Sequence, residues 1–222
     1  MNTPLNIVVL ISGRGSNLQS IIDQVQGGAL PARIRAVISN CADAYGLVRA
    51  QAAGVPTEVL DHRQFPSRHA FDQALMALID QYSPQLVVLA GFMRILGEDF
   101  VDHYAGRLMN IHPSLLPAFP GLHTHERAIE SGVAQHGASV HFVTPDLDGG
   151  PIIIQAAVPV LPGDTPERLA DRVLKEEHRI FPLAIRWFAE GRLQVRAGRV
   201  LLDDRVRAEQ GLIATPEPAS TD

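Results

Sequence analysis

Continuous apolar runs that do not alternate with polar residues most constrain what this chain can fold into. Residues 6–11 (NIVVLI) and 86–90 (LVVLA) are rich in β-branched side chains, and a glycine follows each run within two residues. Such runs are typical of strands buried on both faces, as in a parallel sheet covered by helices. Residues 16–26 follow the first run and place apolar side chains at the i, i+3, i+4 and i+7 positions of an amphipathic helix. The pattern therefore predicts an α/β fold.

Further elements alternate along the chain with short connections. We expect strands at residues 34–38, 56–60 and 108–111 and helices at residues 44–53, 67–82, 98–104 and 125–131. This alternation predicts a doubly wound, mostly parallel sheet with a Rossmann-like N-terminal half.

The pattern changes after residue 110. Strand-like runs at 139–143 and 152–160 are separated by a short turn, which predicts antiparallel strands in the C-terminal half. A helix should run from 165 to 190, and Pro182 should kink or break it. Residues 193–202 indicate a small hairpin, and the last residues, through Pro216 and Pro218, are expected to fray.

Composition excludes several classes of function. The 222 residues carry a net charge of −5, which disfavours a broad nucleic-acid surface because such surfaces need a basic patch. The single cysteine, Cys41, cannot form an internal disulfide, which fits a reducing compartment. The N-terminus lacks the features of a signal peptide, and its apolar run is too short to span a membrane. We therefore expect a cytoplasmic protein that acts on small molecules and binds neither nucleic acid nor membranes.

Residues 12–17 (SGRGSN) separate the first predicted strand from the first predicted helix. Two glycines allow a tight turn, and Ser16 and Asn17 add polar side chains to the free amides of a helix N-terminus, which suits a phosphate. A tight turn with an ordinary helix cap is the alternative. A nicotinamide site is disfavoured because Leu18 replaces the third glycine of the fingerprint, and Asn40 stands where a ribose-binding acid is expected.

Asn110, His112 and Asp148 offer an amide, an imidazole and a carboxylate at turn-like positions just beyond apolar runs. Asn110 and His112 end a predicted strand, where open α/β sheets place their ligands. These group types can stabilise an oxyanion and move a proton during acyl transfer. Each also has a structural alternative: a loop-capping amide, a satisfied histidine and a turn aspartate. The functional interpretation requires the three side chains to meet.

The remaining histidines do not predict a metal site. His123, His125, His136 and His141 lie close in sequence, but their spacing matches no standard zinc motif. Residues 92–96 (FMRIL) are unusually apolar for a loop at the active edge of a sheet. They are either part of the core or the wall of an aromatic ligand pocket, and their periodicity does not decide between these.

With these motifs in place, the chain resembles the phosphoribosylglycinamide formyltransferases, the folate-dependent enzymes of purine synthesis. The resemblance rests on residues 7–17, 86–96, 107–124, 137–155 and 177–182. Residues 110–117 (NIHPSLLP) are shared across folate-dependent formyltransferases and hydrolases. Residues 121–124 (GLHT) and the layout of the whole chain point to the glycinamide-specific family.

The resemblance implies transfer of a formyl group from 10-formyltetrahydrofolate, as co-substrate, to the amine of 5-phosphoribosylglycinamide, without a metal. Positions that match phosphate and ribose contacts are Gly15, Ser16, Asn17 and Glu177. Positions that match folate contacts are Arg68, Met93, Arg94, Ile95, Leu96, Asn110, Thr144, Pro145, Asp146, Leu147 and Asp148. Asn110, His112 and Asp148 match the catalytic residues. Arg14 and Ala118 occupy positions that vary in the family and leave substrate affinity open.

The resemblance also implies a single formyltransferase domain over residues 1–222. It would comprise a phosphate-binding half (1–106), a catalytic and folate-binding half (107–202) and a tail (203–222), in a monomer or weak homodimer. Alternatives are a formyltetrahydrofolate hydrolase, a methionyl-tRNA formyltransferase-like enzyme and a non-catalytic module that binds phosphosugar or folate. The two enzymes normally carry an additional domain, and a binding module has no need of the three convergent groups.

Overall fold

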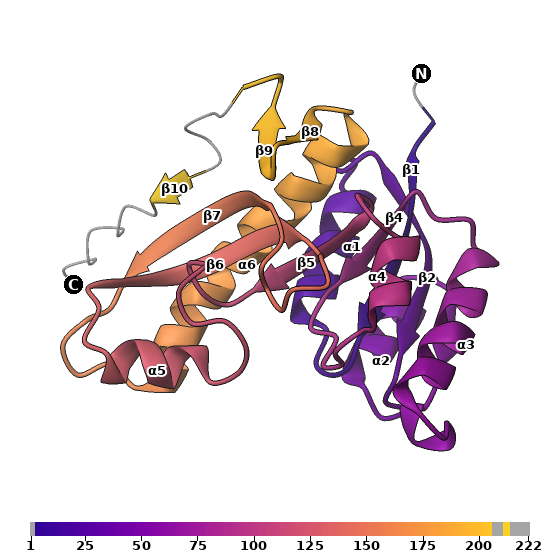
Figure 1. Ribbon diagram of the computed structural model, residues 1–222, viewed down its shortest axis with the longest axis horizontal. Helices are drawn as coiled ribbons and strands as arrows, with labels where there is room; N and C mark the ends of the chain where they lie inside the picture. Colours follow the sequence, from indigo (N-terminus) through magenta and orange to yellow (C-terminus); the bar gives the residue numbers. More distant parts are fainter. Residues whose placement is uncertain (1–2, 206–210, 214–222) are drawn as a thin grey trace.

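One eight-stranded sheet forms the centre of the computed structural model, which describes residues 3–205 and 211–213 (Figure 1). Its strands are β1 (Leu5–Ile11), β2 (Ala32–Ser39), β3 (Thr57–Val59), β4 (Leu86–Leu89), β5 (Leu108–His112), β6 (Gln135–Phe142), β7 (Ile152–Pro159) and β10 (Gly211–Ile213). The helices are α1 (Ser16–Gln26), α2 (Tyr45–Ala52), the short 3-10 helix η1 (His62–Gln64), α3 (Arg68–Asp80), α4 (Glu98–His103), α5 (Thr124–Glu130) and α6 (Pro166–Ala189).

The strand order is β10-β7-β6-β5-β4-β1-β2-β3. Strands β1 to β5 pair in parallel, whereas β6 is antiparallel to both β5 and β7. The carboxyl ends of β1, β4 and β5 consequently meet at one edge of the sheet. Figure 1 shows the N-terminal strands and the C-terminal strands as neighbouring parts of this sheet. This topology confirms the predicted α/β fold, with a parallel N-terminal half and antiparallel strands in the C-terminal half.

Alternate side chains of β1 enter two different cores. Ile7, Val9 and Ile11 pack with apolar residues of α1, α2 and α6, and Val8 and Leu10 pack with those of α3 and α4. All five side chains are fully buried. Helices therefore cover both faces of the sheet, which is why β1 has no polar alternation and why the sheet is doubly wound.

The sequence predicts a kink or break at Pro182, and Pro182 does not break helix α6, because α6 continues from Pro166 to Ala189 (Figure 1). Proline removes the hydrogen bond to the carbonyl four residues earlier, which would normally interrupt a helix. Here Phe181, Ala184 and Ile185 are fully buried against the sheet. Packing of this apolar face contributes more to helix stability than one backbone hydrogen bond does.

The sequence pattern predicts no strand at residues 211–213. These residues form β10, which pairs in parallel with Gln155, Ala156 and Ala157 of β7. The outer edge of β7 offers backbone groups that a short strand can pair with, and this pairing needs no recognisable side-chain pattern. The expected fraying of the last residues, through Pro216 and Pro218, lies outside the described residues.

The predicted terminal hairpin is present. Strands β8 (Leu193–Arg196) and β9 (Arg199–Leu202) form a separate two-stranded antiparallel sheet. None of the helices in the described part of the chain combines the length and the apolar character needed to cross a membrane.

Candidate active site

The loop between β1 and α1 has the geometry of an anion-binding helix N-terminus. Gly15 precedes the helix with a left-handed backbone, at φ 69° and ψ 32°. A Cβ at Gly15 would lie 2.6 Å from the Cα of Gly46, so the close approach of α2 excludes a larger residue. The first amides of α1, including those of Ser16 and Asn17, have no partner within the helix. Together with the helix dipole they suit a phosphate group.

Asn17 and Glu177 connect this loop to α6. Nδ2 of Asn17 donates to Oε2 of Glu177 at 2.6 Å, and both residues are buried. Burial raises the pKa of Glu177, and the hydrogen bond from Asn17 partly opposes this shift. Within the described residues, Oδ1 of Asn17 is buried and accepts no hydrogen bond. A buried oxygen without a donor indicates a place for a ligand donor.

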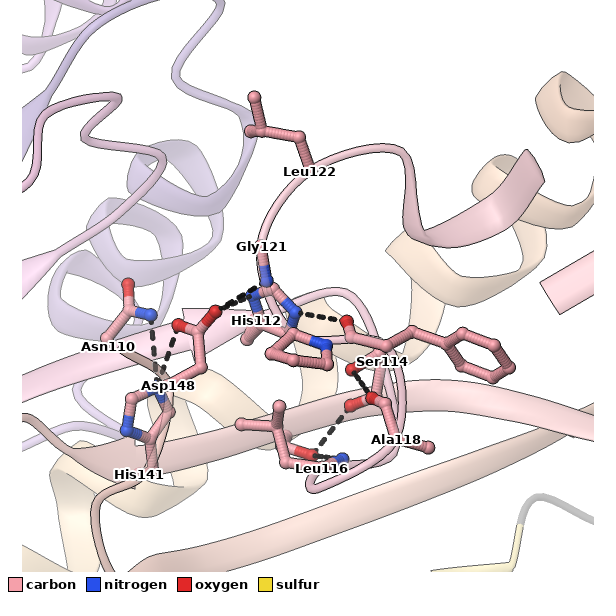
Figure 2. A network of polar contacts seen from close by, with 12 residues as sticks. Asn110, His112, Ser114, Leu116, Ala118, Gly121, Leu122, His141 and Asp148 are labelled. Carbon is pink, nitrogen blue, oxygen red and sulfur yellow. Dashed lines mark hydrogen bonds and ion pairs between the residues drawn. The ribbon is translucent and has the colours of Figure 1, made fainter. Parts of the chain in front are cut away.

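The structure brings Asn110, His112 and Asp148 together at the carboxyl end of β5 (Figure 2). Nδ1 of His112 lies 3.5 Å from Oδ2 of Asp148, and the two side chains are only 8% and 10% exposed. Nδ2 of Asn110 lies 3.1 Å from Nε2 of His141, and that same nitrogen of His141 lies 3.9 Å from Oδ1 of Asp148. His141 thus lies between the amide and the carboxylate and contacts the amide.

The proline-rich loop after β5 encloses His112. Nε2 of His112 donates to the carbonyl oxygen of Phe119 at 3.0 Å, and the amide of Gly121 donates to Oδ2 of Asp148 at 2.8 Å. Both ring nitrogens of His112 therefore face oxygen acceptors. Leu122, the next residue of this loop, is 67% exposed and points away from the network (Figure 2).

Residues 92–96 form both core and surface. Phe92 and Leu96 pack against the core on the α3 side of the sheet. Met93 and Ile95 are 71% and 63% exposed. Exposed apolar side chains at the active edge of the sheet are suited to an aromatic ligand. The segment is therefore partly core, and its exposed side chains remain candidates for the wall of a ligand pocket.

Two arginines accompany this apolar segment. Arg68 is exposed at the first position of α3, and the guanidinium of Arg94 lies 5.8 Å from the ring centre of Phe71. Burial raises the pKa of the nearby Asp72, while Arg68 and Arg94 oppose that shift through their charges. Arg68 and Arg94 thus place two positive charges near Asp72, one on α3 and one in the 92–96 segment.

The loop at residues 144–148 carries the other predicted folate contacts. Leu147 is 61% exposed, Pro145 and Asp146 are exposed, and Thr144 Oγ1 is buried and unpartnered within the described residues. Gly150 ends the loop so close to β6 that a Cβ would lie 1.8 Å from the carbonyl oxygen of Phe142. This constraint fixes where the loop returns and helps to place Asp148.

A cavity of about 630 Å³ adjoins the same loop. Thr144 and Asp146 line it together with Arg199 of the β8–β9 hairpin, whereas the three catalytic candidates are not among its lining residues. In the described residues, no cluster of three or more His, Cys, Asp or Glu side chains could hold a metal ion.

Comparison with known proteins identifies the family. The family profile described as Formyl transferase matches residues 5–185. The chain is 56% identical over 210 residues to phosphoribosylglycinamide formyltransferase of Escherichia coli strain K12. The matched region covers 95% of this chain and 99% of that protein. The chain belongs to the formyl transferase family.

Two solved structures of related enzymes are similar to this chain. A phosphoribosylglycinamide formyltransferase from Coxiella burnetii, crystallised with CHES, matches with a TM-score of 0.89 at 56% identity, over 95% of this chain and 99% of that chain. A formyltetrahydrofolate deformylase from Burkholderia mallei matches with a TM-score of 0.82 at 27% identity, over 90% of this chain and 70% of that chain.

Sequence reasoning missed the role of His141 in this formyl transferase. Burial lowers the pKa of His141, which favours the neutral ring. Nδ1 donates to the carbonyl oxygen of Phe142 at 2.9 Å, which leaves Nε2 as an acceptor for the Asn110 amide. His141 thus orients Asn110 and leaves one N–H of the amide free. Asn110 and His141 are directly paired residues of β5 and β6. The register of these two strands is therefore the feature that would have predicted the contact.

Proposed function

We propose that this chain transfers the formyl group of 10-formyltetrahydrofolate to the amine of 5-phosphoribosylglycinamide in purine biosynthesis. The convergence of Asn110, His112 and Asp148 at the sheet edge carries the proposal. The phosphate loop and the exposed apolar segment at residues 92–96 begin at the carboxyl ends of the neighbouring strands β1 and β4. The family and the 56% identity to the Escherichia coli enzyme support the same substrates.

Each substrate has residues suited to it. The amides of Gly15, Ser16 and Asn17 would hold the phosphate, and Glu177 would accept hydrogen bonds from the ribose hydroxyls. The folate ring would lie against Met93, Arg94, Ile95 and Leu96, closed by residues 144–148, and Arg68 would attract the negative end of the folate. Binding both substrates on one edge would hold the amine close to the formyl carbon, which supplies much of the rate advantage of an enzyme.

Asn110 would stabilise the oxyanion. The amine attacks the formyl carbon and a carbon–nitrogen bond forms, so negative charge develops on the formyl oxygen. The N–H of Asn110 that does not contact His141 can donate to that oxygen. His112 would be a second donor, and for this it must exchange the Phe119 carbonyl or Asp148 for the oxyanion.

Asp148 would act as the general base. Its carboxylate holds His112 from one side and would accept the proton released by the amine, through a water molecule. The bond between the formyl carbon and N10 of the folate then breaks, and N10 takes up the proton that Asp148 had accepted, which leaves the carboxylate ionised again. Products are the formylated amine and tetrahydrofolate.

Tetrahydrofolate release with and without 5-phosphoribosylglycinamide tests the proposal. We expect release only when the acceptor is present, in equal amounts with the formylated product. Release without the acceptor would identify a formyltetrahydrofolate hydrolase, and binding without turnover would identify a non-catalytic module. Formylation of methionyl-tRNA instead would identify the tRNA enzyme. The lower identity to the solved deformylase, 27% against 56%, favours the transferase.

We further propose that the protein acts in the cytoplasm as a monomer or weak homodimer, with residues 1–106 binding the phosphate and residues 107–202 binding folate and catalysing the transfer. The single cysteine and the purine-synthesis relatives support the location. Sedimentation across a range of protein concentrations would test the oligomeric state.

A further inference from the structure

Ser12 joins the phosphate loop directly to the segment proposed to hold folate. Its backbone amide donates to the carbonyl oxygen of Gly91 at 3.0 Å. Its side-chain Oγ accepts the backbone amide of Met93 at 2.8 Å. Ser12 is also the first residue after β1, three positions before Gly15. Ser12 thus contacts the folate segment at Met93 through its side chain, and through its backbone it contacts Gly91, which immediately precedes the segment.

The hydroxyl proton of Ser12 is donated to the side chain of Asn40. Oγ donates to Oδ1 of Asn40 at 2.5 Å, and Asn40 is only 4% exposed. Because that amide oxygen accepts from Ser12, Nδ2 of Asn40 is the donor to Nδ1 of His62, 3.2 Å away. This chain of contacts orients the hydroxyl so that an oxygen lone pair remains for Met93.

A second side chain fixes the other end of the folate segment. Oδ2 of Asp72, a buried residue of α3, accepts the backbone amide of Gly97 at 2.8 Å. The exposed side chains of Met93 and Ile95 lie between these two fixed amides. The attachments differ in one respect, because Ser12 belongs to the phosphate loop and Asp72 does not.

We propose that Ser12 is a positioning residue that couples occupation of the phosphate site to the affinity of the folate site. The inference rests on the proposed substrates. Phosphate bound at residues 15–17 restrains the loop that carries Ser12, and the hydroxyl transmits that restraint to the backbone of Met93. Folate then binds a segment that is already ordered, so less ordering entropy opposes its binding. By thermodynamic linkage, bound folate must tighten binding of the phosphoribosyl ligand by the same factor.

The affinity for tetrahydrofolate, measured by calorimetry with and without saturating 5-phosphoribosylglycinamide, tests this coupling. These two ligands cannot react with each other. We expect the phosphoribosyl ligand to tighten tetrahydrofolate binding by about fivefold or more in the wild type, within the usual range of coupling between sites. Ser12→Ala should reduce the factor to below about twofold, and Ser12→Thr, which keeps the hydroxyl, should restore it.

Asp72→Ala is the matched control. It removes the other attachment of the same segment, so it should weaken tetrahydrofolate binding while keeping the coupling factor. A wild-type factor near one, an unchanged factor in Ser12→Ala or an equal loss in Asp72→Ala would overturn the inference. Normal formyl transfer without coupling would defeat this inference alone, whereas a protein that fails to bind the phosphoribosyl ligand would also defeat the proposed function.

Discussion

The phosphate loop and the catalytic network are built differently, although both lie at the carboxyl edge of the same sheet. The proposed phosphate loop, residues 12–17, offers backbone amides next to Gly15, and the buried pair of Asn17 and Glu177 supports it. The network instead uses side chains from β5, from β6 and from the loop before β7. The first region therefore depends on backbone geometry, and the second depends on ionisable and polar side chains in fixed orientations.

This difference implies a division of labour. Backbone amides at a helix N-terminus bind the phosphate equally in the ground state and the transition state, so changes around them should act on KM. Side chains that meet charge only as the reaction proceeds should act on kcat. The following substitutions test that division, in order of decreasing effect.

Asp148→Asn should cause the largest loss. The amide keeps an acceptor for the Gly121 amide but cannot take the proton of the attacking amine. We expect kcat to fall by about 10²–10⁴, the usual contribution of general acid–base catalysis. Calorimetric titration should give a nearly unchanged Kd for 5-phosphoribosylglycinamide. A variant with near wild-type turnover would remove Asp148 from the mechanism.

Asn110→Ala should lower kcat by about 10²–10³, or about 2.7–4 kcal/mol of barrier, because an oxyanion donor is lost. Steady-state kinetics at saturating concentrations of both substrates would measure this. A change confined to KM would mean that Asn110 binds substrate and does not stabilise the transition state.

His141→Phe should have a smaller effect. The ring remains, but the acceptor that orients the Asn110 amide is lost. Since one neutral hydrogen bond is worth about 0.5–1.5 kcal/mol, kcat should fall by up to about tenfold. His136→Phe is the control, because this buried histidine of the same strand bonds to His125 instead. Equal losses of kcat in both variants would contradict the orienting role.

Glu177→Gln should change binding and pH-dependent stability while leaving kcat within about twofold. Burial raises the pKa of Glu177 in the folded protein. Between the ordinary glutamate pKa and this raised value, the folded state binds a proton that the unfolded state has released. Stability therefore falls as pH increases through that window.

The glutamine variant lacks this pH-dependent penalty. Its Tm relative to that of the wild type should be higher at pH 8 than at pH 5, as measured by calorimetry, and its KM for 5-phosphoribosylglycinamide should rise. A Tm difference that is independent of pH would show that ionisation of Glu177 does not oppose folding.

The sequence predicts local features of the site well and contacts across the fold poorly. The phosphate loop and residues 110–112 are visible because a turn, a helix start and a strand end lie next to one another in sequence. The proximity of Asp148 requires antiparallel strands β6 and β7, which the pattern also indicates. The positions of His141, Ser12 and β10 depend on strand register and on distant partners, and a single sequence contains no periodicity that reveals them.

Pro182 is a position at which a local sequence rule fails. The local rule that proline breaks helices is physically sound, but the burial of Phe181 and Ile185 outweighs it in α6. Local propensity therefore determines the secondary structure of segments with few buried side chains. Tertiary packing determines it in segments with many buried side chains.

The single-turnover rate of formyl transfer, with both substrates saturating, tests the division of labour most directly. The rate should be within about twofold of the wild type for Glu177→Gln and about 10²–10³ lower for Asn110→Ala, because only the second removes a contact made in the transition state. A comparable slowing in both variants, or a wild-type rate for Asn110→Ala, would contradict the account.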